Sequence, residues 1–157
     1  RSTSRTFRPF SMTRLAAVRK LSKAGVYVHV NIAPIIPAIT DSEIEAIAAA
    51  AADHGASSIS WIPIRLPHEV APLFRDWLDV HFPDRASKVI NHIQEMRGGK
   101  DNDPEFFTRM KGQGAWAELI RTRMKIAVSK HGLDSSKWNV RNDLFVPPNL
   151  DGQLSLF

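Results

Sequence analysis

Apolar positions along the chain recur at the two spacings that regular secondary structure requires. At residues 12–24 and 40–54 they return every three or four positions, which predicts helices, and Gly25 supplies a stop after the first. Residues 26–33 and 58–66 instead alternate β-branched with other side chains, which predicts strands. The first 66 residues are therefore expected to form helix, strand, helix and strand in that order.

Prolines and capping residues set the expected ends of these elements. Pro34 and Pro37 are predicted to end the first strand, and Pro63 suggests that the second is an irregular or edge strand. Thr40 and Glu43, three residues apart, form the capping-box pattern that opens a helix.

The second half of the chain is predicted to be helical. A helix between Pro67 and Pro83 has a stripe that is expected to face the core, made of Val70, Leu73, Phe74, Trp77 and Leu78. The next helix ends at Gly98 and has the stripe Ala86, Val89, Ile90 and Ile93. Asp103-Pro104-Glu105 predicts another helix start. A long helix ending at Gly132 has Trp116, Leu119, Ile120, Ala127 and Val128 on one side.

Strands that alternate with helices indicate an α/β fold with right-handed crossovers and a parallel sheet. Two parallel strands alone leave faces and edges uncovered, so upstream sequence or a partner chain is expected to complete the sheet. Residues 1–11 are predicted to be an arm or the remnant of an upstream element, and 12–67 strand–helix units. Residues 68–132 form a helical extension and 133–157 an extended tail in the same interpretation.

The 157 residues include no cysteine, which excludes disulfides, thiolate zinc sites and cysteine nucleophiles in this chain. No apolar run has the length of a membrane-spanning helix, and we expect a cytoplasmic protein without membrane contact. Residues 97–141 carry ten basic and five acidic groups. This zone predicts contact with nucleic acid, DNA above all, through Arg97, Lys100, Arg109 and Lys111. The alternative is a solvated helix face.

Known catalytic and metal-binding motifs do not occur in the sequence. The six histidines are dispersed, His68-Glu69 matches only half of a zincin motif, and no nucleophile elbow or P-loop is present. On the first strand, Tyr27, His29, Asn31 and Ala33 should face away from the covering helices. They would then line a barrel interior or sheet crevice, or simply be ordinary hydrogen-bonded polar groups.

Several separated segments together resemble one family of bacterial radical SAM proteins, the group related to spore photoproduct lyase and described as DNA-repair-photolyase-like. The resemblance covers about residues 15–157. The matching segments are 30–37 (VNIAPIIP), 64–70 (IRLPHEV), 73–78 (LFRDWL), 81–85 (HFPDR), 96–100 (MRGGK) and 110–120 (MKGQGAWAELI).

The resemblance implies the C-terminal portion of a partial (β/α)6 radical SAM barrel, with two parallel strands, flanking helices, a helical extension and an extended tail. In that family a [4Fe–4S] cluster on a C-x-x-x-C-x-x-C motif reduces S-adenosylmethionine, and the 5′-deoxyadenosyl radical abstracts hydrogen from a substrate such as nucleic acid. Because this chain lacks cysteine, it is expected to be a C-terminal fragment, inactive alone, whose missing half holds the cluster. Arg1 in place of Met fits that expectation, and a degenerate paralogue without the cluster is the alternative.

The resemblance also implies part of an adenosine pocket on the two strands. Its residues would be Asn31, Ala33, Pro34, Ile35, Ile64, Arg65 and Leu66. Ala38 stands where the family more often has glycine, which suggests a stiffer loop. No residue in the chain is assigned as a catalytic acid or base.

The last five residues look like the pentapeptide with which bacterial repair proteins bind the DNA sliding clamp. They are Gln153, Leu154, Ser155, Leu156 and Phe157. The apolar members would enter a cleft and the glutamine would set the orientation, although such a terminus can also dock on its own core. A second function class follows, in which the chain is a non-catalytic module that binds nucleic acid and the sliding clamp.

Overall fold

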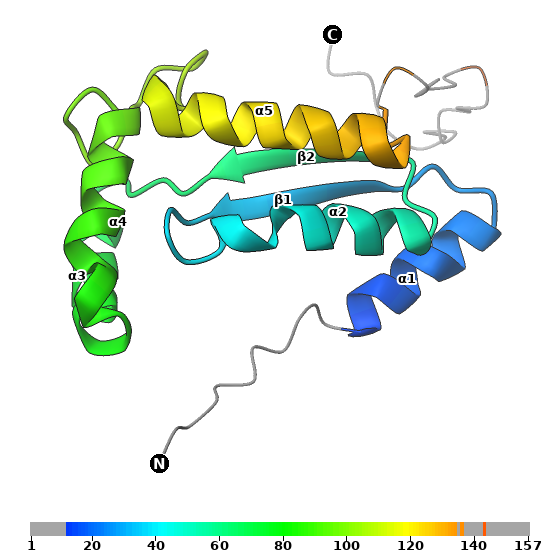
Figure 1. Cartoon of the computed structure of the whole chain (residues 1–157), viewed down its shortest axis with the longest axis horizontal. Coiled ribbons are helices and arrows are strands. Elements are labelled where there is room, and N and C mark those ends of the chain that lie inside the picture. The colour runs from blue at the N-terminus through cyan, green and yellow to red at the C-terminus, as the bar shows by residue number, and fades with distance from the viewer. Residues whose placement is uncertain (1–11, 135, 137–142, 144–157) are drawn as a thin grey trace, which may run out of the picture.

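The computed structural model describes residues 12–134, 136 and 143. Within this part the chain forms five α-helices, one 3₁₀ turn and a sheet of two parallel strands (Figure 1). The predicted α/β class and the parallel pairing are therefore confirmed. None of the helices described is long and apolar enough to cross a lipid bilayer.

The first half follows the predicted order of elements. Its elements are α1 (Met12–Lys23), β1 (His29–Ile35), η1 (Asp41–Glu43), α2 (Ile44–Asp53) and β2 (Ser58–Pro63). In the parallel ladder Asn31 lies opposite Ser60 and Ile32 opposite Trp61, and the side chains of paired residues point to the same face of the sheet. The predicted second strand is confirmed and ends at the proline that was expected to weaken it.

The prediction that Pro34 ends the first strand is wrong. β1 runs through this residue to Ile35, with a cis peptide bond between Ala33 and Pro34. The ladder is irregular between Ile32 and Ile35. A proline that donates no hydrogen bond is tolerated at such an irregular position.

The predicted capping box is also wrong. The hydroxyl of Thr40 accepts the backbone N–H of Ile36 at 2.8 Å, and no side chain caps α2. Thr40 thereby closes the turn after β1, and the 3₁₀ turn η1 leads into the helix instead. The same residue can serve either role because a threonine hydroxyl bonds equally well to a nearby turn.

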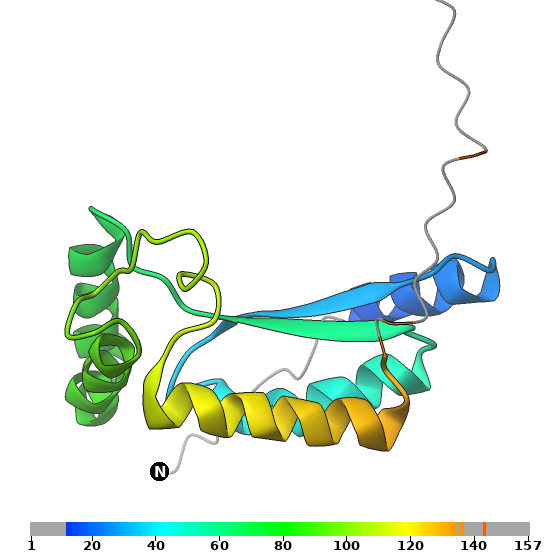
Figure 2. The same ribbon diagram turned by 90° about the horizontal axis from the view of Figure 1, so that it is seen from above.

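The second half contains α3 (Val70–His81), α4 (Pro83–Met96) and α5 (Gly114–His131). Helices α2 and α5 lie side by side on one face of the sheet, while α3 and α4 stand at the carboxyl end of the strands (Figure 2). The helix start predicted at residues 103–105 is absent from the structure. Instead, Asp103 accepts the backbone N–H of Glu105 at 2.9 Å and the hydroxyl of Thr108 at 2.5 Å, which closes a turn.

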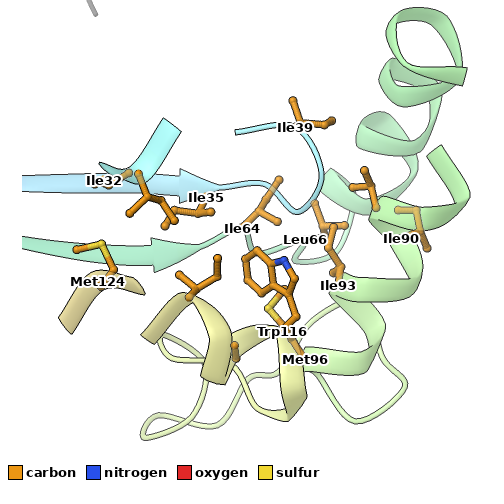
Figure 3. Close-up of a cluster of buried hydrophobic side chains, with 14 of the residues drawn as sticks. Ile32, Ile35, Ile39, Ile64, Leu66, Ile90, Ile93, Met96, Trp116 and Met124 are labelled. Atoms are coloured by element: carbon orange, nitrogen blue, oxygen red, sulfur yellow. The ribbon is translucent and has the colours of Figure 1, made fainter. Parts of the chain in front are cut away.

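One hydrophobic core joins both halves of the chain (Figure 3). Its fully buried members include Ile35, Ile44, Leu66, Leu78, Ile93, Met96 and Ile120. Each such side chain contributes roughly 1.5–3 kcal/mol through the removal of apolar surface from water. Because α5 packs on both β2 and α2, segments 12–67 and 68–132 share this core.

The apolar stripe of α3 faces the core only in part, which contradicts the prediction for that helix. Leu78 is fully buried and Ala71 nearly so, but Leu73 is 66% and Trp77 is 38% exposed. The reason is the position of α3, which packs mainly on α4 beyond the end of the sheet. On α5 the predicted side is confirmed for Trp116 and Ile120 but not for Leu119, which is exposed.

Candidate functional site

Among the described residues, helices cover one face of the sheet and leave the other, here called the open face, without a helix. Figure 2 shows α2 and α5 on the covered side of the strands. Val28 and Ile32 are buried on the helical side, whereas His29, Asn31 and Ala33 are exposed on the open side. The predicted separation of the two faces of β1 is therefore confirmed.

Four polar side chains form a continuous hydrogen-bonded network on the open face. Nδ1 of His29 lies 2.7 Å from Oγ of Ser58, and Nε2 of His29 lies 2.8 Å from Oγ of Ser60. Ser60 donates its hydroxyl proton to Oδ1 of Asn31 at 3.1 Å. All three hydrogen bonds join β1 to β2. The exposed His29 and Asn31 give the open face a polar surface, whereas Ser58 is fully buried.

The direction of these bonds fixes the tautomer of the neutral His29 ring. Because the only proton of the Ser60 hydroxyl points to Asn31, Nε2 of His29 must carry the proton that reaches Ser60. Nδ1 of the ring then accepts the hydroxyl proton of Ser58. Sequence analysis missed this network, although Ser58 and Ser60 share the two-residue spacing of His29 and Asn31.

The predicted adenosine-binding residues divide into an exposed and a buried group. Ala33 and Pro34 are exposed near the carboxyl end of β1, Asn31 is exposed in mid-strand opposite Ser60, and Arg65 is half-buried just after β2. Ile35, Ile64 and Leu66 instead place their side chains in the core (Figure 3). Of the exposed members, Ala33, Pro34 and Arg65 therefore lie toward the carboxyl end of the sheet, and Asn31 lies further back along β1.

The backbone of Ile64 is engaged as well. Its N–H donates to the carbonyl of Ile35 at 3.0 Å, and its carbonyl accepts Nη2 of Arg97 at 3.2 Å. Neither the side chain nor the amide proton of Ile64 is therefore available to a ligand.

Arg97 lies inside the protein and not on the predicted basic surface. It is 4% exposed, and its guanidinium donates to the carbonyls of Arg109 at 2.7 Å and Ile64 at 3.2 Å. Burial lowers the pKa of Arg97 from its ordinary value, Asp103 opposes that effect, and the like charge of Arg65 adds to it. Arg97 therefore fastens the α4–α5 loop, residues 97–113, to the end of β2, and we exclude it from any surface that contacts nucleic acid.

The other predicted basic residues gather around the same loop. Lys100 and Lys111 are exposed, and Arg65 and Arg109 are half-buried. Among the described residues none of these four forms an ion pair with a carboxylate. The Nε atoms of Arg65, Arg97 and Arg109 are buried without a hydrogen-bond partner.

The nearest acids are held by other groups. Asp101 accepts two hydrogen bonds from Nη2 of Arg75, at 2.6 and 2.8 Å, and one from Gln94 at 3.0 Å. The hydrogen bond from Arg75 is the main cause of the lowered pKa of Asp101. The pKa of Asp103 is lowered mainly by the hydroxyl of Thr108 and next by the N–H of Glu105.

Two aromatic rings complete the loop, and sequence analysis did not single them out. Phe106 and Phe107 are 69% and 84% exposed and meet edge to face, with ring centroids 5.4 Å apart. The guanidinium carbon of Arg109 lies 4.8 Å from the centroid of Phe106. The sequence signal for this surface was a Phe-Phe pair beside basic residues. It was overlooked because residues 103–105 were incorrectly predicted to start a helix.

The predicted clamp-binding residues Gln153, Leu154, Ser155, Leu156 and Phe157 lie outside the described residues. Within the described part, no three His, Asp or Glu side chains are grouped so as to hold a metal ion.

Comparison with known proteins gives no match to this chain among family models, curated proteins or solved structures. The fold defines its class, an α/β protein with a parallel strand pair that is covered by helices on one face. The two surfaces suited to binding a ligand are the open face of the sheet and the α4–α5 loop.

Proposed function

We propose that this chain supplies the last two strands of a radical SAM barrel, with the open face of its sheet turned toward the barrel interior. The observation that carries the proposal is the asymmetry of the sheet. Helices cover one face, as they cover the outside of (β/α) barrels, while the other face bears the His29, Ser60 and Asn31 network.

The exposed residues at the carboxyl end of the strands fit an adenosine group. Ala33 and Pro34 offer a small apolar surface to the flat face of a purine, and Asn31 offers polar atoms to a base edge or ribose. Arg65 adds a positive charge at the end of β2. The resemblance implies an adenosine pocket at this edge, which agrees with the general rule that ligands of α/β folds bind where parallel strands end.

In this proposal Asn31, Ala33 and Pro34 would hold the adenosine part of S-adenosylmethionine, which would supply radical hydrogen abstraction when a reduced [4Fe–4S] cluster lies beside it. The 157 residues contain no cysteine, so they do not fit the cluster and its ligands would come from polypeptide outside this sequence. The chain's own residues orient the nucleoside and exclude water from the strand end. We assign none of them to acid–base catalysis.

The test is an NMR titration of the ¹⁵N-labelled chain with S-adenosylmethionine, and with adenosine as the simpler probe. We expect the largest shift changes in the backbone amides of Asn31, Ala33 and Arg65. Ala33→Trp should abolish them, because an indole on the open face occupies the purine position. Ala115→Trp, on an exposed position of α5, is the matched control and should leave them unchanged.

Two results would reject this proposal. One is the absence of shift changes in β1 at saturating concentrations of either probe. The other is an equal loss of binding in the Ala33→Trp and Ala115→Trp variants, which would indicate nonspecific contact.

A further inference from the structure

The α4–α5 loop gathers positive charge at the carboxyl end of the sheet. It crosses that end between α4 and α5 (Figure 2) and contributes Lys100, Arg109 and Lys111, with Arg65 beside it. Nη1 of Arg65 lies 4.0 Å from the sulfur of Met110, which places the two segments in contact. Because no described carboxylate pairs with these four cations, the charge faces outward and is open to an anion.

A buried cation beneath the loop adds an independent observation. Arg97 lines the groove under the loop together with Lys100, Phe107, Thr108 and Gln113. Its side chain is almost wholly buried, and its Nε has no hydrogen-bond partner. Asp103 and Glu105 also line this groove, but Asp103 is held by Thr108. The buried guanidinium of Arg97 therefore lies beneath the groove and adds positive charge to its floor without contacting a ligand itself.

The aromatic rings of the loop indicate which class of anion this surface would bind. Phe106 and Phe107 lie beside the same cations and are among the most exposed large apolar side chains described. Proteins that bind single-stranded nucleic acid combine cations that follow the backbone with exposed rings on which unpaired bases stack. A free phosphate or a phosphopeptide would use the cations but not both rings, and a duplex keeps its base faces stacked internally.

We propose that the α4–α5 loop binds single-stranded nucleic acid. Phosphates contact Lys100, Arg109, Lys111 and Arg65, and successive bases stack on Phe106 and Phe107. This surface shares Arg65 with the proposed adenosine site, but its other residues lie on the α4–α5 loop and not on the open sheet face, so the inference does not depend on the proposed barrel.

The experiment measures the fluorescence anisotropy of a labelled oligo(dT) of about 12 nucleotides, within the site sizes known for such proteins. The whole 157-residue chain is titrated at several salt concentrations, starting at about 50 mM. We expect binding that weakens as salt rises. Phe107→Ala should weaken it about tenfold, and the double variant Phe106→Ala/Phe107→Ala further, because each stacked base contributes on the order of 1–3 kcal/mol.

Charge variants separate phosphate contacts from stacking. Lys100→Ala and Lys111→Ala should each lower the salt slope by about one, whereas the phenylalanine variants should leave the slope unchanged. Lys20→Ala and Lys23→Ala on α1, at the other end of the sheet (Figure 1), are matched controls. Arg5→Ala/Arg8→Ala controls for the basic residues that precede α1. Circular dichroism checks that each variant is folded.

Several outcomes would overturn the inference. These are no binding at about 50 mM salt, unchanged affinity in the double phenylalanine variant, or loss of binding in the α1 or Arg5/Arg8 controls. Equal competition by inorganic phosphate, a phosphopeptide or duplex DNA would show an anion surface without base stacking and would also reject it. None of these results affects the titration with S-adenosylmethionine, so the two proposals fail independently.

Discussion

Replacing Arg97 by methionine tests whether one buried guanidinium holds the α4–α5 loop on the sheet. Methionine retains an apolar stem of similar length and removes every donor. The carbonyls of Ile64 and Arg109 then lose the hydrogen bonds that now measure 3.2 and 2.7 Å. Ile64 is buried, so its carbonyl has little access to water as a substitute.

The magnitude follows from the number of bonds and from the burial of the charge. A hydrogen bond to a charged group contributes roughly 1.5–3 kcal/mol net. We use the lower end of this range for Arg97. Burial is the main cause of its lowered pKa, so burial disfavours the charged guanidinium and offsets part of the stabilisation from its hydrogen bonds. Two bonds lost at that lower end give about 3 kcal/mol of destabilisation. Arg97→Lys should cost less, because one ammonium keeps the charge and can retain one of the two bonds.

Urea unfolding followed by circular dichroism at pH 7 measures the change in the free energy of unfolding. Lys100→Ala is the matched control in the same loop and should remain within about 0.5 kcal/mol of the parent, because Lys100 is exposed. Amide hydrogen exchange in residues 98–113 should accelerate in Arg97→Met and not in the control. A loss below about 1 kcal/mol with an unchanged denaturant slope would refute the reasoning.

Three further predictions concern other parts of the molecule. Arg75 holds the pKa of Asp101 below its ordinary value when the protein is folded. The pair therefore stabilises the fold above pH about 4, and this stabilisation is lost as the pH falls through the folded pKa. In Arg75→Gln the free energy of unfolding should fall less than in the parent when the pH is lowered through this range. In the neutral ring of His29, ¹⁵N NMR should find the proton on Nε2, and a proton on Nδ1 would contradict the bond directions. A fluorescent peptide of residues 147–157 should bind purified sliding clamp in the micromolar range, and no binding up to ~1 mM would exclude clamp contact.

The strand pair was predictable because side chains alternate along the first part of β1. Val28, just before β1, and Ile32 are buried on the helical side, and the intervening His29 and Asn31 mark the open face. The order of strands and helices then implied parallel pairing. The hydrogen-bonded network was not predicted, because it depends on the register that sets Ser58 opposite His29 and Ser60 opposite Asn31.

The helices beyond the sheet were less predictable for a geometric reason. A stripe of apolar residues shows which side of a helix can be buried, but not how much surface its neighbour offers. α3 has only α4 to pack against, so Leu78 is buried while Leu73 and Trp77 remain largely exposed. The turn at Asp103 shows a second limit, since Asp-Pro is equally suited to a helix start and to a side-chain-closed turn.

Arg97 shows why a charge count cannot by itself locate a binding surface. In the sequence it belongs to the same basic zone as Lys100 and Lys111, yet the structure uses it to join the loop to β2. By occupying the interior it fixes the backbone at Arg109, whose guanidinium lies against Phe106. The buried Arg97 therefore positions the exposed cations and rings of the loop. Substitutions of Arg97 test the stability of the loop, and substitutions of the exposed residues test binding.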